Sequence, residues 1–406
     1  MNRKTVVVLG GGIGGIVTAN ALRKKLNSIH RVLLVDKQSE FVFAPSLLWV
    51  MRGWRRPEQV SRNLRRLVNP GVEVNVSEAQ RLDLDGGQIE TNAGNIDYDY
   101  LVVSLGADLV PAGIPGFGEA ALSPYDLSGA TQLKESLLDF EGGRMLVLVT
   151  STPYKCPAAP YETALLVDDF LRSKRIRERC ELEVYTPEIL PMGVAGPEMG
   201  QAVVSMLETK SISFNPKISL NRIDPERKEL NFTDSESVPF DFLIAVPPHR
   251  PPAVVQGSEL ANEAGWIPVD RKTMKTRYEN VYAIGDVAAV TLANGKPLSK
   301  AGVFAEGQGH IVAGRIADEI EGVEARAEFD GLGFCWIETG EGQAGFAGGE
   351  FYAEPDPVVP LPRSGRTWHW GKILFEKYWL SKGISRFMAK SLLRIGGKLM
   401  RVPASF

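Results

Sequence analysis

The chain has 406 residues, of which 44% are hydrophobic and 23% are charged, and its formal net charge is −3. This composition excludes an intrinsically disordered chain and allows two or three buried cores. The charge is uneven, because residues 363–401 carry ten Lys or Arg and one acid, Glu376, so the remainder of the chain is acidic.

The start of the chain and its cysteines limit the cellular context. A strand-like run begins at Thr5, and no apolar run reaches the ~20 residues that a membrane-spanning helix needs. We therefore expect a protein that is made without cleavage and does not cross a bilayer. The cysteines are too few and too scattered for a disulfide scaffold or a metal site; they are Cys156, Cys180 and Cys335.

The first forty residues predict a βαβ unit that binds a dinucleotide. An apolar strand, a helical run and a second apolar strand follow one another at Val6–Leu9, Ile13–Leu26 and Val32–Val35. The turn between the first strand and the helix fits G-x-G-x-x-G, with Gly10, Gly12 and Gly15. These glycines permit a tight turn and a close approach of pyrophosphate to the helix N-terminus. Asp36, which ends the second strand, is expected to hold a ribose hydroxyl pair.

Three further segments complete the first domain. Trp49–Leu67 is a basic amphipathic stretch with six arginines, for which a solvated helix is the simplest interpretation, and Val72–Val76 is an expected strand. Ile96–Gly106 is an apolar strand that closes on a glycine turn, and it resembles an element of flavoproteins that have two dinucleotide-binding domains. Pro111–Gly118, rich in Pro and Gly, is expected to cross into a second domain.

The second domain opens with a buried strand, Met145–Val149, but the turn after this strand contains no glycine. Its residues include Pro153, Lys155, Cys156, Pro157 and Pro160. Such a stiff loop cannot nest a phosphate, although it can hold one thiol in a fixed position, so we do not expect nicotinamide binding. Further elements of this domain are expected at Leu182–Tyr185, Glu198–Leu207 and Phe242–Val246.

The chain then returns to the first domain. Thr276–Asp286 resembles the distal flavin motif, in which the aspartate binds the ribityl chain, so Asp286 takes this role by resemblance. A helix is expected from Lys300-Ala-Gly302 through Ala313. In this fold its N-terminus points at the pyrimidine edge of the flavin, and its partial positive charge would favour the anionic reduced form. The alternative is that Lys300 and its neighbours only cap the helix.

Seven motifs spread over nearly the whole chain identify a family. They are Phe43-x-Pro45-Ser46, Cys156-Pro-x-x-Pro160-Tyr-Glu162, Thr186-Pro-Glu188, Val246-Pro-Pro-His-Arg250, Gly265-Trp266, Ala283-x-Gly285-Asp286 and Cys335-Trp336. Together they resemble the sulfide:quinone oxidoreductases and the flavin subunit of flavocytochrome c sulfide dehydrogenase. The resemblance implies an α/β fold with two Rossmann-like dinucleotide-binding domains. It divides the chain into a discontinuous FAD-binding domain at residues 1–115 and 266–325 and a second domain with the Cys156 loop at residues 116–265. Residues 326–406 would form a C-terminal quinone and membrane-interface region.

The resemblance also assigns the chemistry. Cys156 and Cys335 would form a redox-active pair over the flavin: hydrosulfide attacks their disulfide, one cysteine keeps the sulfur as a persulfide, and the released thiolate passes two electrons to FAD. Glu162 would move protons near this site, with a plain surface acid as the alternative. For the two thiols the alternative is inert burial, and Cys180 is expected to be structural.

Other site residues follow from the same resemblance. The cofactor set is Gly10, Gly12, Gly15, Asp36, Lys37, Pro45, Ser46, Ala79, Ser104, Gly106, Gly285, Asp286, Lys300, Ala301 and Gly302. The candidates for stacking on a quinone are Trp336, Phe375 and Tyr378, with ordinary core aromatics as the alternative. Many family members carry a further cysteine before the second strand, and this chain has none near Ser123–Asp126, so a covalent flavin link is in doubt. The histidines that some members place at the sulfur site are not evident either. A two-cysteine cycle in which a small thiol or sulfite accepts the sulfur is therefore possible.

The C-terminal tail combines aromatic, aliphatic and basic residues at helical spacing over Trp368–Trp379 and Ile384–Met400. Such segments lie in the interface of an anionic membrane, and packing on the protein body is the alternative. The leading hypothesis is a monotopic flavoenzyme that transfers electrons from sulfide to quinone. We expect no nucleic-acid partner, and a homo-oligomer is possible. The alternatives are a sulfide dehydrogenase subunit that donates to a cytochrome, and a non-catalytic flavin-holding subunit. A type II NADH dehydrogenase is disfavoured by the glycine-free loop.

Overall fold

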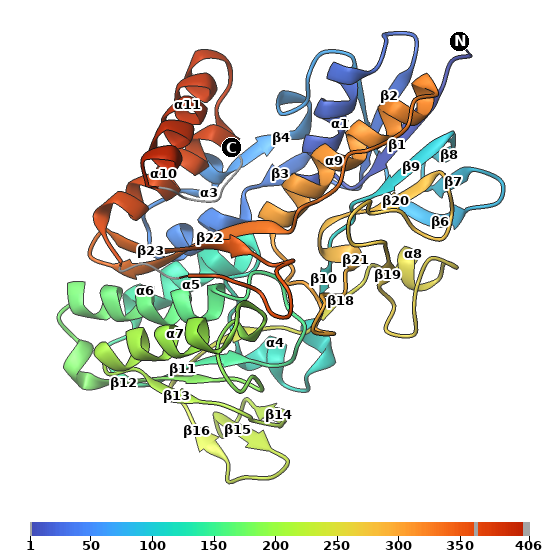
Figure 1. Ribbon diagram of the computed structural model, residues 1–406. Coiled ribbons are helices and arrows are strands. Elements are labelled where there is room, and N and C mark those ends of the chain that lie inside the picture. Colours follow the sequence, from blue (N-terminus) through green and yellow to red (C-terminus); the bar gives the residue numbers. More distant parts are fainter. Residues whose placement is uncertain (1, 361–363, 401–406) are drawn as a thin grey trace.

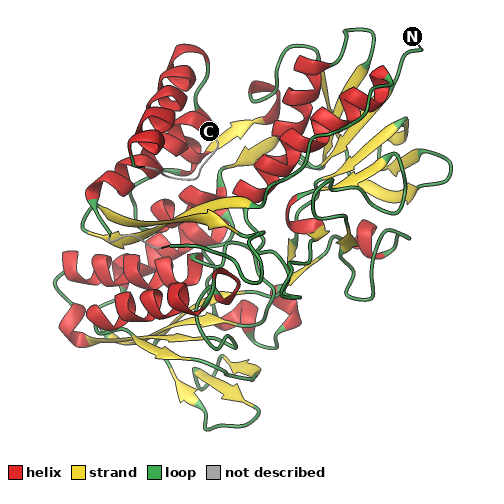
Figure 2. Ribbon diagram, in the orientation of Figure 1, coloured by secondary structure: helices red, strands yellow, loops and turns green. Residues whose placement is uncertain are grey.

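The computed structural model describes residues 2–360 and 364–400. Two parallel sheets with helices form the two main bodies of the chain, and a β-hairpin followed by two helices completes it (Figure 1). Figure 2 shows the helices gathered along the sheets and the long loops between them. The predicted α/β class with parallel sheets is confirmed.

The first sheet is parallel throughout and has the order β20-β9-β1-β2-β5. Its strands are β1 (Thr5–Leu9), β2 (Arg31–Asp36), β5 (Val72–Val76), β9 (Tyr100–Val103) and β20 (Val281–Ala283). The central strand is almost completely buried, as its apolar run predicts for a sheet covered on both faces. Helices α1 (Ile13–Lys25) and α9 (Gly302–Glu321) pack against each other beside this sheet, although 289 residues separate their starts. The early and late parts of the chain therefore build one body.

The second sheet has the order β13-β12-β11-β17 and is also parallel. Its strands are β11 (Gly143–Val149), β12 (Cys180–Tyr185), β13 (Ser213–Asn215) and β17 (Phe242–Val246). Helices α5 (Leu127–Asp139), α6 (Ala159–Ser173) and α7 (Pro197–Thr209) belong to this body, and Figure 1 shows α6 and α7 side by side along the sheet. A three-stranded antiparallel sheet extends from it, with β14 (Leu220–Asp224), β15 (Glu229–Phe232) and β16 (Val238–Pro239).

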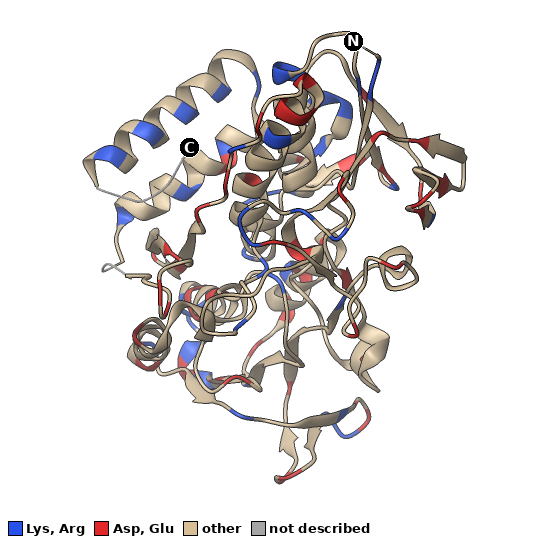
Figure 3. Ribbon diagram, turned by 45° about the vertical axis from the view of Figure 1, so that its right-hand side comes forward, with Lys and Arg blue, Asp and Glu red and all other residues tan. Residues whose placement is uncertain are grey.

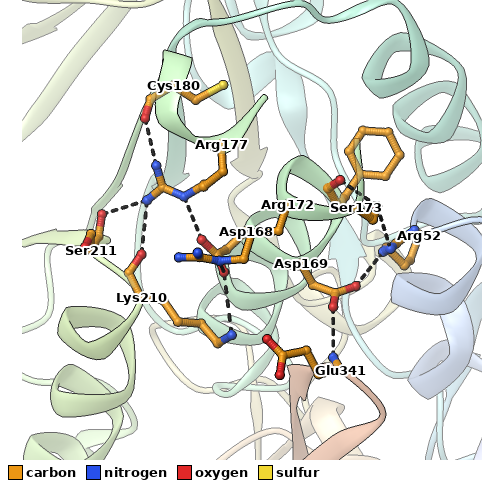
Figure 4. Close-up of polar contacts among 11 residues, drawn as sticks. Arg52, Asp168, Asp169, Arg172, Ser173, Arg177, Cys180, Lys210, Ser211 and Glu341 are labelled. Carbon is orange, nitrogen blue, oxygen red and sulfur yellow. Dashed lines mark hydrogen bonds and ion pairs between the residues drawn. The ribbon is translucent and has the colours of Figure 1, made fainter. Parts of the chain in front are cut away.

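Helix α6 is anchored by two adjacent aspartates (Figure 4). Asp168 is fully buried and pairs with Arg172, Arg177 and Lys210 at 2.8, 2.6 and 3.5 Å. Asp169 accepts from Arg52 at 2.9 Å and from the backbone N–H of Glu341 at 2.8 Å. These bonds join α6 to the second sheet, to the first domain and to the C-terminal hairpin.

The hairpin consists of β22 (Leu332–Gly340) and β23 (Gln343–Glu350) and lies between α6 and the C-terminal helices α10 (Arg366–Leu380) and α11 (Gly383–Leu399) (Figure 1). Trp379 is 1% exposed, so α10 is part of the core. Helix α11 exposes a stripe of large apolar side chains that includes Ile384, Phe387 and Leu399. Basic residues recur along α11 (Figure 3). Within the part of the chain that is described, no helix combines the length and apolarity needed to span a bilayer.

The predicted helix over Trp49–Leu67 is wrong. The segment forms α2 (Leu47–Met51), α3 (Pro57–Val60), β4 (Ser61–Asn63) and the 3₁₀ turn η2 (Leu64–Arg66). Gly53, at φ +82°, and Pro57 interrupt any longer helix. Three of its arginines are bound by other parts of the protein: Arg55 pairs with Glu376 of α10, Arg62 donates to the backbone oxygen of Leu380, and Arg52 pairs with Asp169 of α6. The others, Arg56, Arg65 and Arg66, are exposed.

Small antiparallel elements complete the first body. Strand β3 (Glu40–Val42) pairs with β4, and a meander is formed by β6 (Ala79–Asp83), β7 (Gln88–Thr91) and β8 (Gly94–Asp97). The predicted strand over Ile96–Gly106 is therefore split between β8 and β9. The helix expected to end at Ala313 runs on to Glu321.

Candidate active site

The glycines of the turn after β1 differ in how closely the rest of the protein surrounds them. A Cβ on Gly10 would lie 2.3 Å from the backbone oxygen of Ser104, and one on Gly15 would lie 1.8 Å from that of Gly10. These two glycines are required for packing. Gly12 is different, because its φ of −74° suits any residue and a Cβ there would meet nothing within 4 Å. A glycine at an open position where a helix begins fits the close approach of a pyrophosphate.

Two helix N-termini are free to bind an anionic or polar group. Helix α1 begins after Gly12 and α9 begins after Ala301, and neither has a side-chain cap or an acid in its first turn. The first amides of a helix need partners from outside it. Asp36, at the end of β2, accepts from the N–H of Gly11 at 2.6 Å and therefore lies beside the turn. The residues present fit the FAD that the fold implies.

Charged residues surround the start of α9. Burial raises the pKa of Asp286, while the charges of Lys155 and Lys300 oppose this rise. Lys300 donates from Nζ to the backbone oxygen of Asp286, and this nitrogen lies 3.5 Å from the centre of the Trp266 ring. Burial also lowers the pKa of Lys300 to about 8. The Lys300 side chain is thus held by contacts within the protein.

The remaining predicted cofactor residues are distributed around the same body. Lys37 is exposed just after β2, Ala79 begins β6, and Pro45 and Ser46 form the 3₁₀ turn η1 (Ala44–Ser46). The hydroxyl of Ser46 donates to Glu376 at 2.7 Å and so binds α10. Ser104 donates from its backbone to Leu9, Gly106 adopts φ +71°, and Gly285 donates to Gln308 at 2.7 Å.

The Cys156 loop is attached to the start of α9. The N–H of Cys156 donates to the backbone oxygen of Lys300 at 2.7 Å, and its oxygen accepts from Ala159 at 2.9 Å. Cys156 has φ +56°, which is uncommon for a residue with a side chain. Although this residue is exposed, the surrounding protein desolvates its thiolate, and this together with the charge of Glu162 raises the pKa of Cys156 to about 12.

Cys335 lies on β22, which packs against α6, the helix that follows Cys156. Burial raises the pKa of Cys335, and the negative charge of Cys156 raises it further. Neither of these two thiols is in a disulfide. Cys180 is a separate buried thiol whose Sγ donates to the backbone oxygen of Ile176 at 3.2 Å.

A buried charge cluster adjoins the thiols. Glu162 pairs with Lys372 of α10, and Glu338 of β22 lies 2.9 Å from Nδ1 of His369. Burial raises the pKa of Glu162 to about 7, against the opposing charge of Lys372. Glu162, Lys372 and Glu338 are 5% exposed or less. Glu162 is thus not a surface acid, and it can gain or lose a proton near neutral pH.

The sequence analysis missed Lys372, Glu338 and His369. Lys372 stands in a basic tail, where its charge indicates a headgroup contact, and only the packing of α10 on the core buries it. The hairpin that carries Glu338 is rich in glycine and lacks a clear apolar alternation. A buried acid in such a strand is therefore not visible from the sequence.

The predicted quinone residues form one aromatic cluster. The ring centres of Trp336 and Phe375 are 5.1 Å apart, those of Phe375 and Tyr378 are 6.3 Å apart, and all three residues are buried. The hydroxyl of Tyr378 donates to Glu306 of α9 at 3.2 Å, and burial raises the pKa of Glu306 to about 7. Because neighbouring residues of a strand point to opposite faces, Cys335 and Trp336 face different sides of β22.

Known proteins share this architecture. The family described as pyridine nucleotide-disulphide oxidoreductase matches residues 4–149 and 162–309. A sulfide-quinone reductase of Aquifex aeolicus is 29% identical over 93% of this chain and 91% of that protein. A mitochondrial sulfide:quinone oxidoreductase of Mus musculus is 25% identical over 89% of this chain and 82% of that protein. The crystal structure of the sulfide:quinone oxidoreductase from Aquifex aeolicus aligns with a TM-score of 0.83 and 26% identity, over 93% of this chain and 91% of that one.

Proposed function

The chain belongs to the pyridine nucleotide-disulphide oxidoreductase family, and we propose that it oxidises sulfide through Cys156 and Cys335 and passes the electrons through FAD to a membrane quinone. The observation that carries this proposal is the loop after β11, where a fixed cysteine stands in place of the glycine turn of a nucleotide site. The second thiol, Cys335, lies on β22, which packs against α6, the helix that follows Cys156. The domain boundaries and site residues inferred from the sequence are part of the same proposal.

The thiol chemistry requires an oxidised pair. Hydrosulfide attacks the disulfide between Cys156 and Cys335, so that one S–S bond breaks, a new one forms as a persulfide, and the other sulfur leaves as a thiolate. Bound FAD would supply the two-electron transfer from the thiol side to the quinone. Both thiols have raised pKa values, so a thiolate released here is a strong nucleophile but a poor leaving group. A nucleophilic acceptor then takes the outer sulfur of the persulfide, which leaves two thiolates, and loss of two electrons from these thiolates to bound FAD would re-form their disulfide.

Proton transfer is assigned to Glu162. Its carboxyl group has a pKa of about 7 and lies in the same charge cluster as Cys156 and Lys372. A pKa near the operating pH lets a group both accept and donate a proton. Glu162 therefore takes up the proton of hydrosulfide or thiol when negative charge moves from sulfur to the flavin.

The acceptor side lies among the aromatic residues between β22 and α10. Trp336, Phe375 and Tyr378 are buried against one another there, and the proposal places the quinone ring beside this aromatic cluster. Helix α11, with its exposed apolar stripe and basic residues, is suited to an anionic membrane surface, where each cation adds about 1 kcal/mol. This arrangement favours a membrane quinone over a cytochrome as acceptor.

Reduction of the flavin tests the proposal directly. Sulfide added without oxygen to the purified FAD-loaded protein should bleach the visible flavin absorbance, and a short-chain quinone should restore it. NADH in a parallel sample should leave the absorbance unchanged. Bleaching by NADH together with no response to sulfide would overturn the proposal.

A further inference from the structure

A carboxylate behind the Cys156 loop is bound by two tyrosines. Glu188 follows β12, and its Oε2 accepts from the hydroxyl of Tyr154 at 2.6 Å and from that of Tyr161 at 2.5 Å. Thr186 adds a longer bond of 3.3 Å. Both tyrosines are buried, Tyr161 completely. Hydrogen bonds to a carboxylate are stronger than those between neutral groups, so this cluster is a firm local constraint.

The two tyrosines stand on either side of the cysteine in the sequence. Tyr154 precedes Cys156 by two residues, and Tyr161, on the first turn of α6, follows it by five. The loop is held on its other side by the backbone bond from Cys156 to Lys300. Since Cys156 adopts a positive φ, its conformation depends on such surrounding contacts. Glu188 therefore links the start of the Cys156 loop, through Tyr154, to the first turn of α6, through Tyr161.

The first domain contains an equivalent contact. There Asp36 is the last residue of the second strand of its sheet and accepts from the N–H of Gly11, in the turn after the first strand. Glu188 likewise comes after the second strand of its sheet and reaches the loop after the first. In dinucleotide-binding domains an acid at this place binds ribose hydroxyls. In the second domain, the hydroxyls that donate to this acid, Glu188, are those of Tyr154 and Tyr161.

We propose that Glu188, through Tyr154 and Tyr161, is a positioning residue that holds Cys156 in its reactive orientation. The acid of a former ribose site thus supports a thiol site. Glu188 makes no contact with the thiol itself, so its effect passes through the two phenols. This inference rests on the proposed sulfide chemistry for its kinetic readout, but the geometry of the loop does not depend on it.

The test compares variants of the FAD-loaded protein that remove or keep the hydrogen-bond acceptor at position 188. Glu188→Ala removes it, whereas Glu188→Gln keeps an oxygen that can accept from the tyrosines. We expect Glu188→Ala to slow flavin reduction by sulfide roughly tenfold or more, since small misplacements of reacting groups have effects of this size. Glu188→Gln should recover most of the rate. The KM for the quinone and the FAD content should be unchanged in both.

A matched control is available on β12, the strand that precedes Glu188. Tyr185→Phe removes a bond of 3.0 Å to Glu183, another tyrosine–glutamate contact that does not involve the Cys156 loop, and should leave the rate unchanged. Tyr154→Phe provides a milder test if Glu188→Ala fails to fold. Wild-type rates in Tyr154→Phe and in a folded Glu188→Ala protein would overturn the positioning role and leave the proposed function intact.

Failure of the proposed function itself would look different. The wild-type protein would then not respond to sulfide, and the loop would be tested by the rate at which iodoacetamide labels Cys156, followed by peptide mass spectrometry. A changed labelling rate in Glu188→Ala, recovered in Glu188→Gln and absent in Tyr185→Phe, supports the positioning role. Equal labelling in all four proteins would overturn it.

Discussion

Replacing Lys372 with methionine should make stability fall with rising pH above neutrality. Lys372 is 5% exposed and is the cation paired with Glu162. Methionine keeps a long flexible side chain but removes the charge. Without that charge, the pKa of Glu162 rises above its present value of about 7, because Lys372 is the group that opposes the effect of burial. The folded variant then holds a proton on Glu162 well above pH 7.

The size of the effect follows from proton linkage. The ordinary pKa of this carboxyl group is 4.5, so the unfolded chain has lost the proton long before pH 7. While the folded state keeps a proton that the unfolded state has released, stability decreases as pH rises, by about 1.4 kcal/mol per pH unit. In the wild-type protein this decrease ends near pH 7. In Lys372→Met it should continue, which adds about 2 kcal/mol of destabilisation between pH 7 and pH 8.5.

Urea unfolding of the FAD-loaded protein at pH 7 and pH 8.5 measures this difference. The matched control is the double variant Lys372→Met with Glu162→Gln, which has no carboxyl to titrate and cancels the contributions of all other groups. Among the groups that face Glu162, Glu338 keeps its contact with His369, and Cys156, with a pKa of about 12, stays protonated over this range. If the single and double variants lose stability equally between the two pH values, the linkage of Glu162 to Lys372 is wrong.

Three further predictions follow, two of them with paired variants and one with a truncation. Cys335→Ser should abolish flavin bleaching by sulfide with FAD still bound, whereas Cys180→Ser should not, as stopped-flow absorbance would show; bleaching retained in Cys335→Ser contradicts the thiol pair. Gly15→Ala should destabilise the apoprotein by several kcal/mol, because its Cβ would overlap a backbone oxygen, whereas Gly12→Ala should fold normally and bind FAD at least tenfold more weakly in fluorescence titration; equal effects would contradict the pyrophosphate site. Removal of residues 383–406 should release the protein from anionic liposomes in flotation while sulfide still reduces the flavin, and continued flotation would refute the membrane role of α11.

Local patterns predicted the elements whose physical cause is local. The glycine turn, the strands around it and the helix after it depend on neighbouring residues, and the structure has all of them within a residue or two. The prediction for Trp49–Leu67 failed because its arginines suggested a solvated helix, although Arg52 binds α6 and Arg55 binds α10. The sequence alone cannot show this, since these partners lie more than 100 residues away.

The candidate site shows the same division. Cys156 stands out because prolines replace the expected glycines in its loop, which is a local signal. The partner of Glu162 does not stand out, because Lys372 is 210 residues away and belongs to a helix whose composition indicates a surface role. Tertiary packing decides which face of α10 is buried, and no periodicity in the sequence distinguishes a lysine that pairs in the core from one that binds a headgroup.

The two C-terminal helices therefore serve different ends, and this alters how the membrane hypothesis can be tested. A deletion from Trp368 onward would remove Lys372, Phe375 and Trp379 together with α11. Since these side chains are buried against α6, β22 and the first domain, their loss would damage the sulfide half-reaction and the fold as well as the membrane contact. Helix α11 contributes few buried side chains and exposes its apolar stripe, so its removal separates attachment from chemistry. The boundary at Ser381, between the two helices, is where the membrane contact and the catalytic core can be distinguished.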